Sequence, residues 1–508
     1  MDPLPQLPPL ESRASARVQP ETILAVAACA AAAIWIDLGN IHHWEDGDSM
    51  IPVLVSRQRW LPYMWEQDRF GMLMPLLAMP FKDLVLNLLV QRGLFLFFGF
   101  CSFLAAARWA FDTARWQLLG LAGAALWVGL APERESFGYL GDEPYGPALL
   151  LSFWALIVAR GTGRRIWRWP LAAVLMLAGH WVNAAMCLYL VPLVAARGLA
   201  IALGHHGEAR RQALLDGAVQ TGWGIFGGLT AYVANRSGLT GPRATTLNPL
   251  PIAEWPKGWM QLGRNLWTAD LKPQHLVWVC LALGAAGAAA MVLSPRWRRE
   301  TAEPARILGA IVVTSTGYFL LAGSLSHVAA NLYAGRYVEP MLPFLEVGLL
   351  ALVFVPLSSA LAGWPYRAAC AVAAAGVMVG SAWTFGPPAP SKIRPQLDGI
   401  ASLTPEVVSA RCTHVAGWYW MVWPTVMMTN QTLYERGEAR QVFGISDRSG
   451  PTRELAMSMP ADQVRICVPL DDRWALGWLR QYGYPPLVLL EHGPRLAVLG
   501  VQGAQPPR

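Results

Sequence analysis

Apolar segments long enough to cross a membrane recur from about residue 22 to residue 385, and they constrain the fold of this chain more than any other feature. A hydrocarbon core about 30 Å thick needs roughly 17 to 25 residues of helix. The chain is 54% hydrophobic and only 14% charged, whereas soluble domains carry about 25% charged residues. Too few polar groups are present to cover a soluble globule of this size. The sequence therefore predicts a polytopic α-helical membrane protein.

The number of spans follows from the apolar segments. Residues 170–203 form one nearly continuous apolar run, which we divide at the sequence GHWVN because a run of 34 residues exceeds what one tilted helix can use. With that division the sequence predicts about eleven membrane helices, at residues 22–38, 88–107, 117–132, 144–159, 170–182, 184–203, 215–234, 275–293, 307–325, 341–360 and 367–385.

The placement of arginine predicts the orientation, because short loops rich in Lys and Arg stay in the cytoplasm. The dense arginine clusters fall in alternate loops, at 108–115, 160–168, 197–211, 294–306 and in the turn before Arg367. This pattern predicts a multi-pass protein of the cell inner membrane with a cytoplasmic tail at 1–21. The opposite, periplasmic side then receives the loops 39–87, 133–143, 235–274 and 326–340 and the carboxy-terminal segment 386–508.

The formal net charge of +7 does not indicate nucleic-acid binding. The arginines that produce it flank membrane spans and do not form one basic face. The chain also lacks a glycine-rich phosphate loop, a CxxC pair, an HExxH motif and a GxSxG motif. Nucleotide hydrolysis and zinc peptidase chemistry therefore have no support in the sequence.

The segment after residue 386 differs in composition from the spans. Its runs QVRICVPL and PPLVLLEHGPRLAVLGV, bounded by Pro, Gly and Asp, predict strands, and GWYWMVWPTVMMTNQTLYERG predicts a helix. We therefore expect a small α/β domain outside the membrane. Cys412 and Cys467 both lie in it, and an oxidising compartment favours a disulfide between them.

An aromatic cluster in this segment has two interpretations. Trp418, Tyr419, Trp420 and Trp423 follow one another closely. Packing in a core, or in a belt at the membrane surface, is the interpretation we favour. The alternative is a platform on which a sugar ring stacks.

Acidic residues stand directly after the first span, in the sequence EDGDS at 45–49. The run that follows them, IPVLVSRQRWLPYMW, mixes apolar and basic residues and predicts a helix in the plane of the membrane surface, with its aromatic residues at headgroup level. Such a helix would hold Asp46 and Asp48 at the mouth of a cavity.

Other polar residues are predicted on the same membrane face. Each of these residues also has an ordinary interpretation. Glu45, Glu133 and Glu135 can simply be solvated loop residues, His180 can be a hydrogen-bonded structural residue, and Arg336 can anchor the end of a helix. Their convergence on one face under a topology derived only from arginines favours a functional site, because ionisable groups at span ends are costly. The candidates are Asp142, Glu143, His180, Asn183, His327, Asn331, Arg336 and Tyr337.

These features together resemble the GT-C superfamily of polytopic glycosyltransferases. The shared features are the acidic motif after the first span, a second acidic pair at Asp142 and Glu143, an arginine near the outer end of a late span and an external carboxy-terminal domain. Protein O-mannosyltransferases, lipid A aminoarabinose transferases and oligosaccharyltransferases belong to this superfamily. The phrases WEQDRFG and GWYWMVWP also resemble those of uncharacterised bacterial members.

The resemblance implies an inverting transfer of sugar from a polyprenyl-phosphate carrier to an acceptor hydroxyl on a lipid, a glycan or a protein. It implies that an aspartate of the first external loop is the catalytic base. Asp48 is the first choice and Asp46 the second, because the loop has DGD where the family most often has DE. Asp142 and Glu143 match a site that binds a divalent metal, Mg or Mn, in some relatives. Other relatives need no metal, so no cofactor is certain.

The donor phosphate calls for an arginine. Arg336 is the first candidate, with Arg57, Arg59 and Arg69 behind it. Tyr337, His180, Asn183 and His327 complete the expected substrate-binding set. The alternative functions are a transporter or flippase for an envelope glycolipid or sugar, for which Glu346 inside the tenth span is the main evidence, and a non-catalytic scaffold.

Overall fold

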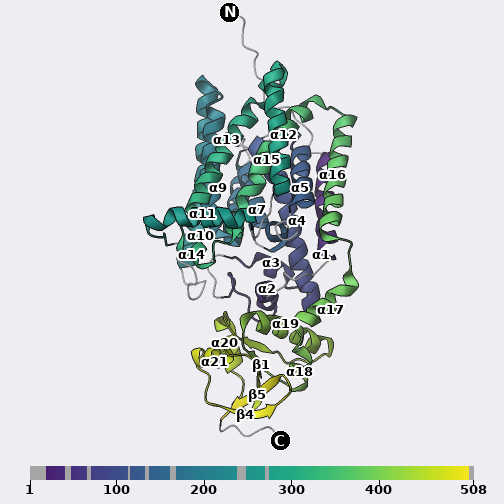
Figure 1. Cartoon of the computed structure of the whole chain (residues 1–508), viewed down its shortest axis with the longest axis vertical. Helices are drawn as coiled ribbons and strands as arrows, with labels where there is room; N and C mark the ends of the chain where they lie inside the picture. The colour runs from purple at the N-terminus through teal and green to yellow at the C-terminus, as the bar shows by residue number, and fades with distance from the viewer. Residues whose placement is uncertain are drawn as a thin grey trace, which may run out of the picture.

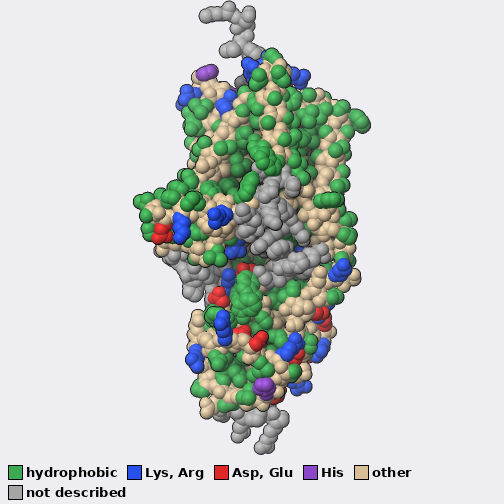
Figure 2. All heavy atoms as spheres, in the orientation of Figure 1, with side chains coloured by type: hydrophobic (Ala, Val, Ile, Leu, Met, Phe, Trp, Pro, Cys, Tyr) green, Lys and Arg blue, Asp and Glu red, His purple; other side chains and the backbone are tan. Residues whose placement is uncertain are grey.

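The computed structural model is mostly helical (Figure 1). Its long helices run side by side along the longest axis of the molecule, and a sheet lies at one end. Hydrophobic side chains dominate the visible face of the bundle, whereas charged side chains gather around the sheet and at the opposite end (Figure 2). The structure describes residues 19–39, 47–65, 70–111, 115–131, 137–142, 144–160, 167–236, 248–268 and 274–502.

A helix overlaps each of the segments predicted to span the membrane. The bundle consists of α1 (Pro20–Asp37), α4 (Leu84–Phe111), α5 (Trp116–Leu130), α7 (Tyr145–Ala159), α8 (Arg168–Val182), α9 (Cys187–Ala202), α10 (Gly207–Arg236), α12 (Gln274–Leu293), α13 (Pro295–Gly323), α15 (Leu342–Ala360) and α16 (Trp364–Phe385). Six helical stretches among the described residues are both long and apolar enough to cross a membrane, and three more are apolar but shorter. The chain is thus a multi-pass membrane protein.

Glycines allow these helices to approach closely. A Cβ atom added to Gly146 of α7 would lie 2.5 Å from the Cα atom of Gly99 in α4. One added to Gly198 of α9 would lie 2.8 Å from the Cα atom of Gly217 in α10. Because lipid supplies no hydrophobic force between helices, van der Waals contact of small residues is what holds such a bundle together.

The predicted division of residues 170–203 is present. Helix α8 ends at Val182, and a 3-10 turn η2 (Ala184–Met186) precedes α9. The Oδ1 atom of Asn183 accepts a hydrogen bond from the backbone N–H of Ala185 at 3.1 Å, which caps the turn. The two helices then diverge, since α8 packs mainly on α7 and α9 on α10 and α13.

Shorter elements lie between the bundle and the sheet or along the side of the bundle. They are α2 (Gly47–Arg57), α3 (Leu73–Ala78), the π-helical turn η1 (Gly138–Asp142), η3 (Ile252–Glu254), α11 (Trp255–Thr268), α14 (Ser326–Ala330), η4 (Gly335–Tyr337) and η5 (Glu339–Met341).

The expectation for α2 as a helix on the membrane surface was wrong. Its residues Met50, Ile51, Val53, Leu54 and Val55 are all fully buried. A helical stretch that is apolar on every side, such as residues 50–55, packs inside a protein, and α2 packs against α3, α4 and the carboxy-terminal segment. The helix that lies crosswise on the side of the bundle is α11 (Figure 1).

The aromatic residues that follow α2 also face inward. Trp65 is fully buried, and its ring packs edge-on against Trp423 with 5.8 Å between the centroids. The two tryptophans join the loop after α1 to the carboxy-terminal segment. Burial of both rings removes about 2 to 3 kcal/mol of unfavourable hydration per residue.

The carboxy-terminal segment contains a five-stranded sheet of order β2-β1-β3-β5-β4. The strands β2, β1 and β3 are parallel, and β5 and β4 continue the sheet as an antiparallel hairpin. The predicted strands and the predicted helix α19 are present. The elements are α17 (Pro390–Ile400), α18 (Thr404–Ser409), β1 (His414–Ala416), α19 (Tyr419–Glu435), β2 (Phe443–Ile445), α20 (Gly450–Met457), η6 (Ala461–Gln463), β3 (Ile466–Pro469), α21 (Ala475–Gln481), β4 (Leu487–His492) and β5 (Leu496–Val501).

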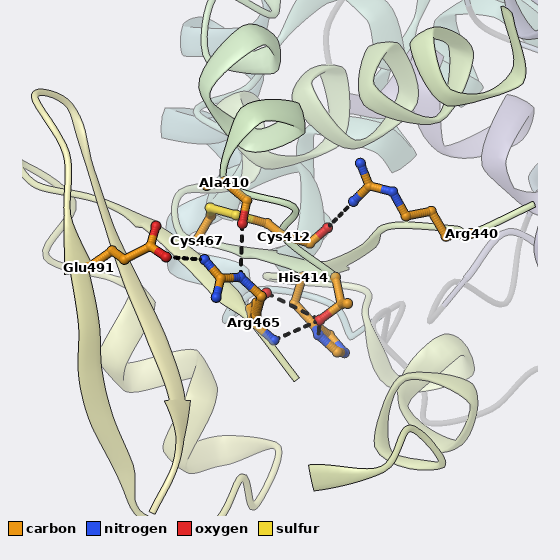
Figure 3. The surroundings of a disulfide bond; sticks show 8 residues. Ala410, Cys412, His414, Arg440, Arg465, Cys467 and Glu491 are labelled. Carbon is orange, nitrogen blue, oxygen red and sulfur yellow. Dashed lines mark hydrogen bonds and ion pairs between the residues drawn. A yellow bond between two sulfur atoms is a disulfide. The ribbon is translucent and has the colours of Figure 1, made fainter. Parts of the chain in front are cut away.

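A disulfide joins Cys412 to Cys467, which confirms the predicted pair (Figure 3). The Cα atoms of the two residues are 5.9 Å apart. Beside the bond, Arg465 donates to the carbonyl of Ala410 at 2.9 Å and pairs with Glu491 at 2.6 Å. The bond therefore links the residue two positions before β1 to β3, in the middle of the sheet.

Candidate functional site

Loops predicted to share one face of the membrane are in contact. The backbone of Phe70 pairs with that of Asn183. Gly71 donates to the carbonyl of Val182 at 3.2 Å, and the indole N–H of Trp181 donates to the carbonyl of Pro62 at 2.7 Å. The first loop and the break between α8 and α9 therefore lie at the same end of the bundle.

Arginines of the predicted cytoplasmic loops gather around one helix end. Arg160 and Arg197 donate to the carbonyls of Trp109 and Ala110 at 2.6 and 2.8 Å. These carbonyls belong to the last turn of α4, where the unpaired backbone oxygens attract cations. In Figure 2, Lys and Arg side chains are visible at the end of the bundle opposite the sheet.

Asp48 stands in the first turn of α2 and contacts two residues of the carboxy-terminal segment. Its Oδ1 atom accepts hydrogen bonds from the Tyr419 hydroxyl and from Nη1 of Arg448. The same Nη1 atom donates to the Tyr419 hydroxyl at 2.7 Å, and the guanidinium lies 5.0 Å from the centroid of that ring. The side chain of Asp48 is 39% exposed, whereas that of Arg448 is 16% exposed. A partly open carboxylate thus meets a largely buried cation.

The parallel strands explain why these residues meet. Tyr419 comes three residues after Ala416, the end of β1, and Arg448 comes three residues after Ile445, the end of β2. Ala416 and Ile445 are paired in the sheet. The carboxyl ends of neighbouring parallel strands are the usual position for a binding site in an α/β sheet.

Two backbone features bring the groups close. A Cβ atom added to Gly47 would lie 2.6 Å from the Tyr419 ring, so glycine is required where α2 approaches α19. Arg448 has φ of 70°, a conformation that non-glycine residues rarely adopt and that is frequent at functional sites.

Charges near Arg448 keep its guanidinium positive. Burial opposes the charged form, but the neighbouring Tyr419 and Asp48 outweigh burial and raise the pKa of Arg448 above its ordinary value. The carboxylate of Asp48 therefore faces a permanent cation, which can also serve an anionic substrate.

Several predicted residues lie outside the described part. Asp46, Arg69 and Glu143 are not described, and neither is the side chain of Asp142, whose backbone ends η1. Among the residues that the structure describes, no group of three or more His, Cys, Asp or Glu side chains is placed to hold a metal ion. The metal site at Asp142 and Glu143 stays a prediction.

Arg336, Tyr337 and His327 form a second cluster between α13 and α15. The Tyr337 hydroxyl and Nε2 of His327 are 3.1 Å apart, and their rings meet edge-on at 5.5 Å. The guanidinium of Arg336 lies 5.5 Å from the centroid of the Tyr337 ring, and the residue is exposed. The guanidinium of Arg336 thus lies on an aromatic face.

His180 and Asn183 are each only 1% exposed. Nδ1 of His180 is 3.1 Å from the carbonyl of Met176, and a Cβ atom at Gly227 of α10 would lie 2.6 Å from it. Asn183 caps η2, as described above. This geometry favours the structural interpretation of both residues. Arg57 ends α2 and is half-buried. Arg59 donates to the carbonyl of Pro451 at 2.7 Å and pairs with Glu454 at 3.1 Å, and the side chain of Asn331 donates to the carbonyl of His327 at 2.8 Å.

Sequence reasoning missed Arg448 and the role of Tyr419. In the sequence, Tyr419 is only one member of an aromatic cluster. Arg448 lies in the turn DRSG after a short apolar run, and 400 positions separate it from Asp48. The available signal was the order strand, polar turn, helix, which occurs after both β1 and β2 and marks the carboxyl edge of a parallel sheet.

Comparisons with known proteins gave a similarity at the level of the fold. No protein-family model matches the sequence, and no curated protein matches it significantly. The structure is similar to that of ArnT from Cupriavidus metallidurans bound to undecaprenyl phosphate, with a TM-score of 0.47 and 12% identity over 96% of this chain and 98% of that chain. It is also similar to the apo state of that ArnT, with a TM-score of 0.46 and 11% identity over 96% and 99% of the two chains.

Proposed function

We propose that this protein is an inverting glycosyltransferase that moves a sugar from a polyprenyl-phosphate carrier to an acceptor hydroxyl at the extracytoplasmic face of the membrane. The observation that carries the proposal is the partly exposed carboxylate of Asp48, held by Tyr419 and Arg448 where the first external loop meets the sheet. The resemblance of the sequence motifs to the GT-C superfamily supports the same reaction. The lipid carrier of the proposed donor is of the same chemical class as undecaprenyl phosphate.

The chemistry needs a base and a cation. Asp48 takes the proton of the acceptor hydroxyl as its oxygen attacks the anomeric carbon. The bond between that carbon and the phosphate oxygen breaks, and its electron pair leaves with the polyprenyl phosphate. Attack from the face opposite the phosphate inverts the anomeric centre. General-base catalysis of this kind typically contributes 10²- to 10⁴-fold.

Two arginines are candidates for the leaving phosphate. Arg336 is the candidate from sequence, and its guanidinium is exposed on the Tyr337 ring. Arg448 is the candidate from geometry, because it already touches the catalytic carboxylate. An arginine that exchanges Asp48 for the donor phosphate would release the carboxylate as a base when the donor arrives, so binding and activation would be coupled.

Sugar transfer from a labelled polyprenyl-phosphate sugar in membranes tests the assignment of Asp48. We expect Asp48→Asn to lower the transfer rate by about 10²- to 10⁴-fold. The matched control is Asp462→Asn, the same chemical change at an exposed residue of η6. The control should transfer at the wild-type rate. Full transfer by Asp48→Asn, with the protein present in the membrane at the normal level, would refute the role of Asp48.

The same assay separates the two arginines. Replacement of the phosphate-binding arginine by glutamine should raise the KM for the donor by tenfold or more, since an ionic hydrogen bond of about 1.5 to 3 kcal/mol is lost. Arg448→Gln and Arg336→Gln are the two variants. Only replacement of the arginine that binds phosphate should raise the KM for the donor. The KM for the acceptor should stay constant in both variants.

One observation favours transport as a second function. Glu346 in α15 is 3% exposed, and neither carboxylate oxygen has a hydrogen-bond partner among the residues that the structure describes. Ionisable groups inside membrane spans are costly and often mark a pathway. Liposomes that contain the purified protein decide between the functions. Flux of a labelled lipid-linked sugar without product, abolished in Glu346→Gln, would favour a transporter, and product formation without flux would favour the transferase.

A further inference from the structure

A hollow in the carboxy-terminal segment has no part in the proposed reaction. Its volume is about 610 Å³, within the range of roughly 300 to 1,000 Å³ typical of small-molecule sites. Trp418 and Trp474 line it and are 51% and 50% exposed. Exposed indoles that face one hollow are unusual on a folded surface and indicate a binding site.

One shared carboxylate, that of Asp472, holds the main chains of the two tryptophans. Asp472 accepts hydrogen bonds from the backbone N–H groups of Trp418, Trp474 and Ala475, the last two at 2.7 and 3.2 Å. A Cβ atom at Gly417 would lie 2.3 Å from Oδ2 of Asp472, so the contact requires glycine there. Because the carboxylate holds both main chains, the two backbone positions that carry the indoles have a fixed separation before any ligand arrives.

The sheet explains why these residues meet. Trp418 follows β1, and Trp474 follows β3, which pairs with β1 in parallel. The hollow therefore lies at the same carboxyl edge as Tyr419 and Arg448, between the next two strands. Trp418 and Tyr419 are adjacent in the chain, and the hydroxyl of Tyr419 binds Asp48. A ligand on Trp418 is thus one residue away from the proposed catalytic contact.

The lining indicates a neutral ligand with many hydroxyl groups. Two carboxylates, Asp471 and Asp472, and two guanidiniums, Arg473 and Arg495, line the hollow, so their formal charges cancel. Asp471 is exposed and makes no hydrogen bond or ion pair within the described part of the chain. A phosphate would call for an excess of cations, and an acyl chain would call for a lining without charges. A sugar offers an apolar ring face to an indole and hydroxyls to carboxylates and arginines.

We propose that this hollow binds a saccharide of the acceptor, with the ring faces on Trp418 and Trp474 and the hydroxyls on Asp471 and Arg473. The proposal rests on the transferase function above, because it makes the bound glycan the acceptor. For Trp418, the proposal replaces the interpretation that we favoured for the aromatic cluster. The buried Trp423 packs in the core, whereas the exposed Trp418 is a platform for a sugar ring.

Glycan binding by the full chain in detergent tests the proposal. The probes are an array of free oligosaccharides and the glycans released from the envelope of the source cells. We expect the wild type to bind a subset, Trp418→Ala and Trp474→Ala each to weaken binding about tenfold, and the double variant to show none. Trp→Phe replacements should restore part of the affinity. Leu476→Ala, an exposed apolar residue beside Trp474, is the matched control and should bind normally.

Two further comparisons separate the possibilities. The affinity for one glycan is measured twice, once with the glycan linked to a lipid in nanodiscs and once with the glycan free in solution. The comparison shows whether the acceptor is carried by a lipid. Asp48→Asn should bind glycan as the wild type does, so a failure of catalysis and a failure of binding are distinguishable. The proposal is overturned if no probe binds the wild type. It is also overturned if the double variant, present and folded in the membrane, binds glycan as well as the wild type.

Discussion

Two aspartates lie near the same edge of one sheet but are held in different ways. Asp48 receives hydrogen bonds from two side chains, the Tyr419 hydroxyl and the Arg448 guanidinium. Asp472 receives its hydrogen bonds from backbone N–H groups. Side-chain donors can turn to another partner, whereas backbone donors cannot move unless the strands move. The first arrangement suits a group that takes part in a reaction, and the second suits a group that fixes a shape.

Loss of the disulfide should have the largest effect, because the bond braces the edge that carries both aspartates. The bond between Cys412 and Cys467 closes a loop of 55 residues, for which the chain-entropy estimate is about 4 kcal/mol. We expect Cys412→Ser to lower the free energy of unfolding of the sheet by that amount. Hydrogen exchange of β1 and β3 in the full chain, titrated with urea, measures the loss.

Cys187→Ser, which removes a free cysteine outside the sheet, is the control and should leave exchange in β1 unchanged. Reduction of the wild type should reproduce the variant. Equal exchange in oxidised and reduced protein would show that the bond does not brace this edge. The backbone-held site of Asp472 should loosen more than the contact of Asp48, because only the former depends on the pairing of β1 with β3.

Acid should weaken the same edge through His414 in β1. Burial lowers the pKa of His414 to about 4, and its ring lies between Phe443 and Tyr484. An unfolded histidine titrates near 6.5, so between these two pH values the unfolded chain binds a proton that the native chain does not. Stability is therefore complete above about pH 6.5 and falls as the pH drops toward 4, by about 3 kcal/mol in total.

Hydrogen exchange of the sheet measured at several pH values detects this loss. His414→Phe should remove most of the pH dependence. His492→Gln changes an exposed histidine of β4 and should keep it. A pH profile of His414→Phe that equals that of the wild type would assign the acid sensitivity to another group.

The membrane part of this fold could be predicted from the sequence because its signal is local. Each span is one apolar run, and arginines near the ends of the runs reveal which loops lie together. Asp48 could also be nominated, since it follows the first span directly. The disulfide could also be predicted from the sequence, because only two cysteines lie in the carboxy-terminal segment.

The partners of Asp48 and Asp472 could not be predicted in this way. They depend on which short strands pair, and β1, with only three residues, carries almost no periodic signal. The error on α2 has a related cause. Its apolar run indicates a surface helix as long as the partner that buries it, α19, is unknown, and α19 is far away in the sequence.

The contact that fixes the tryptophans is the next target. Asp472→Ala leaves the backbone N–H groups of Trp418, Trp474 and Ala475 without their acceptor. Unsatisfied donors cost about 1 to 3 kcal/mol, and water reaches this edge in part, so we expect a loss of about 2 kcal/mol in the stability of the sheet. Urea titration followed by hydrogen exchange measures it.

Asp471→Ala is a matched control in the same hollow. It should keep the wild-type stability, because Asp471 makes no hydrogen bond among the described residues. Glycan binding should fall in both variants, whereas sugar transfer to a small acceptor should fall in neither. Equal stability of Asp471→Ala and Asp472→Ala would show that the backbone contact contributes nothing.

The smallest effect should come from Tyr419→Phe, which leaves the ring and removes one donor from Asp48. The Arg448 guanidinium remains on the carboxylate, so the site keeps its charge balance. A hydrogen bond to a partly exposed group contributes about 1 kcal/mol, which corresponds to a roughly fivefold lower kcat. The stability of the sheet should not change. Tyr434→Phe, an exposed tyrosine on the same helix, is the control and should transfer normally.

The pH profile of Tyr419→Phe gives the stronger test of the contrast between the two aspartates. If the hydroxyl positions Asp48 as a base, its loss should lower kcat at every pH and leave the donor KM constant. If the hydroxyl only joins α2 to α19, the loss should appear in thermal stability, and kcat should be that of the wild type. The second result would make Asp48 a structural group like Asp472, and the exchange of partners that we infer for it would not be needed.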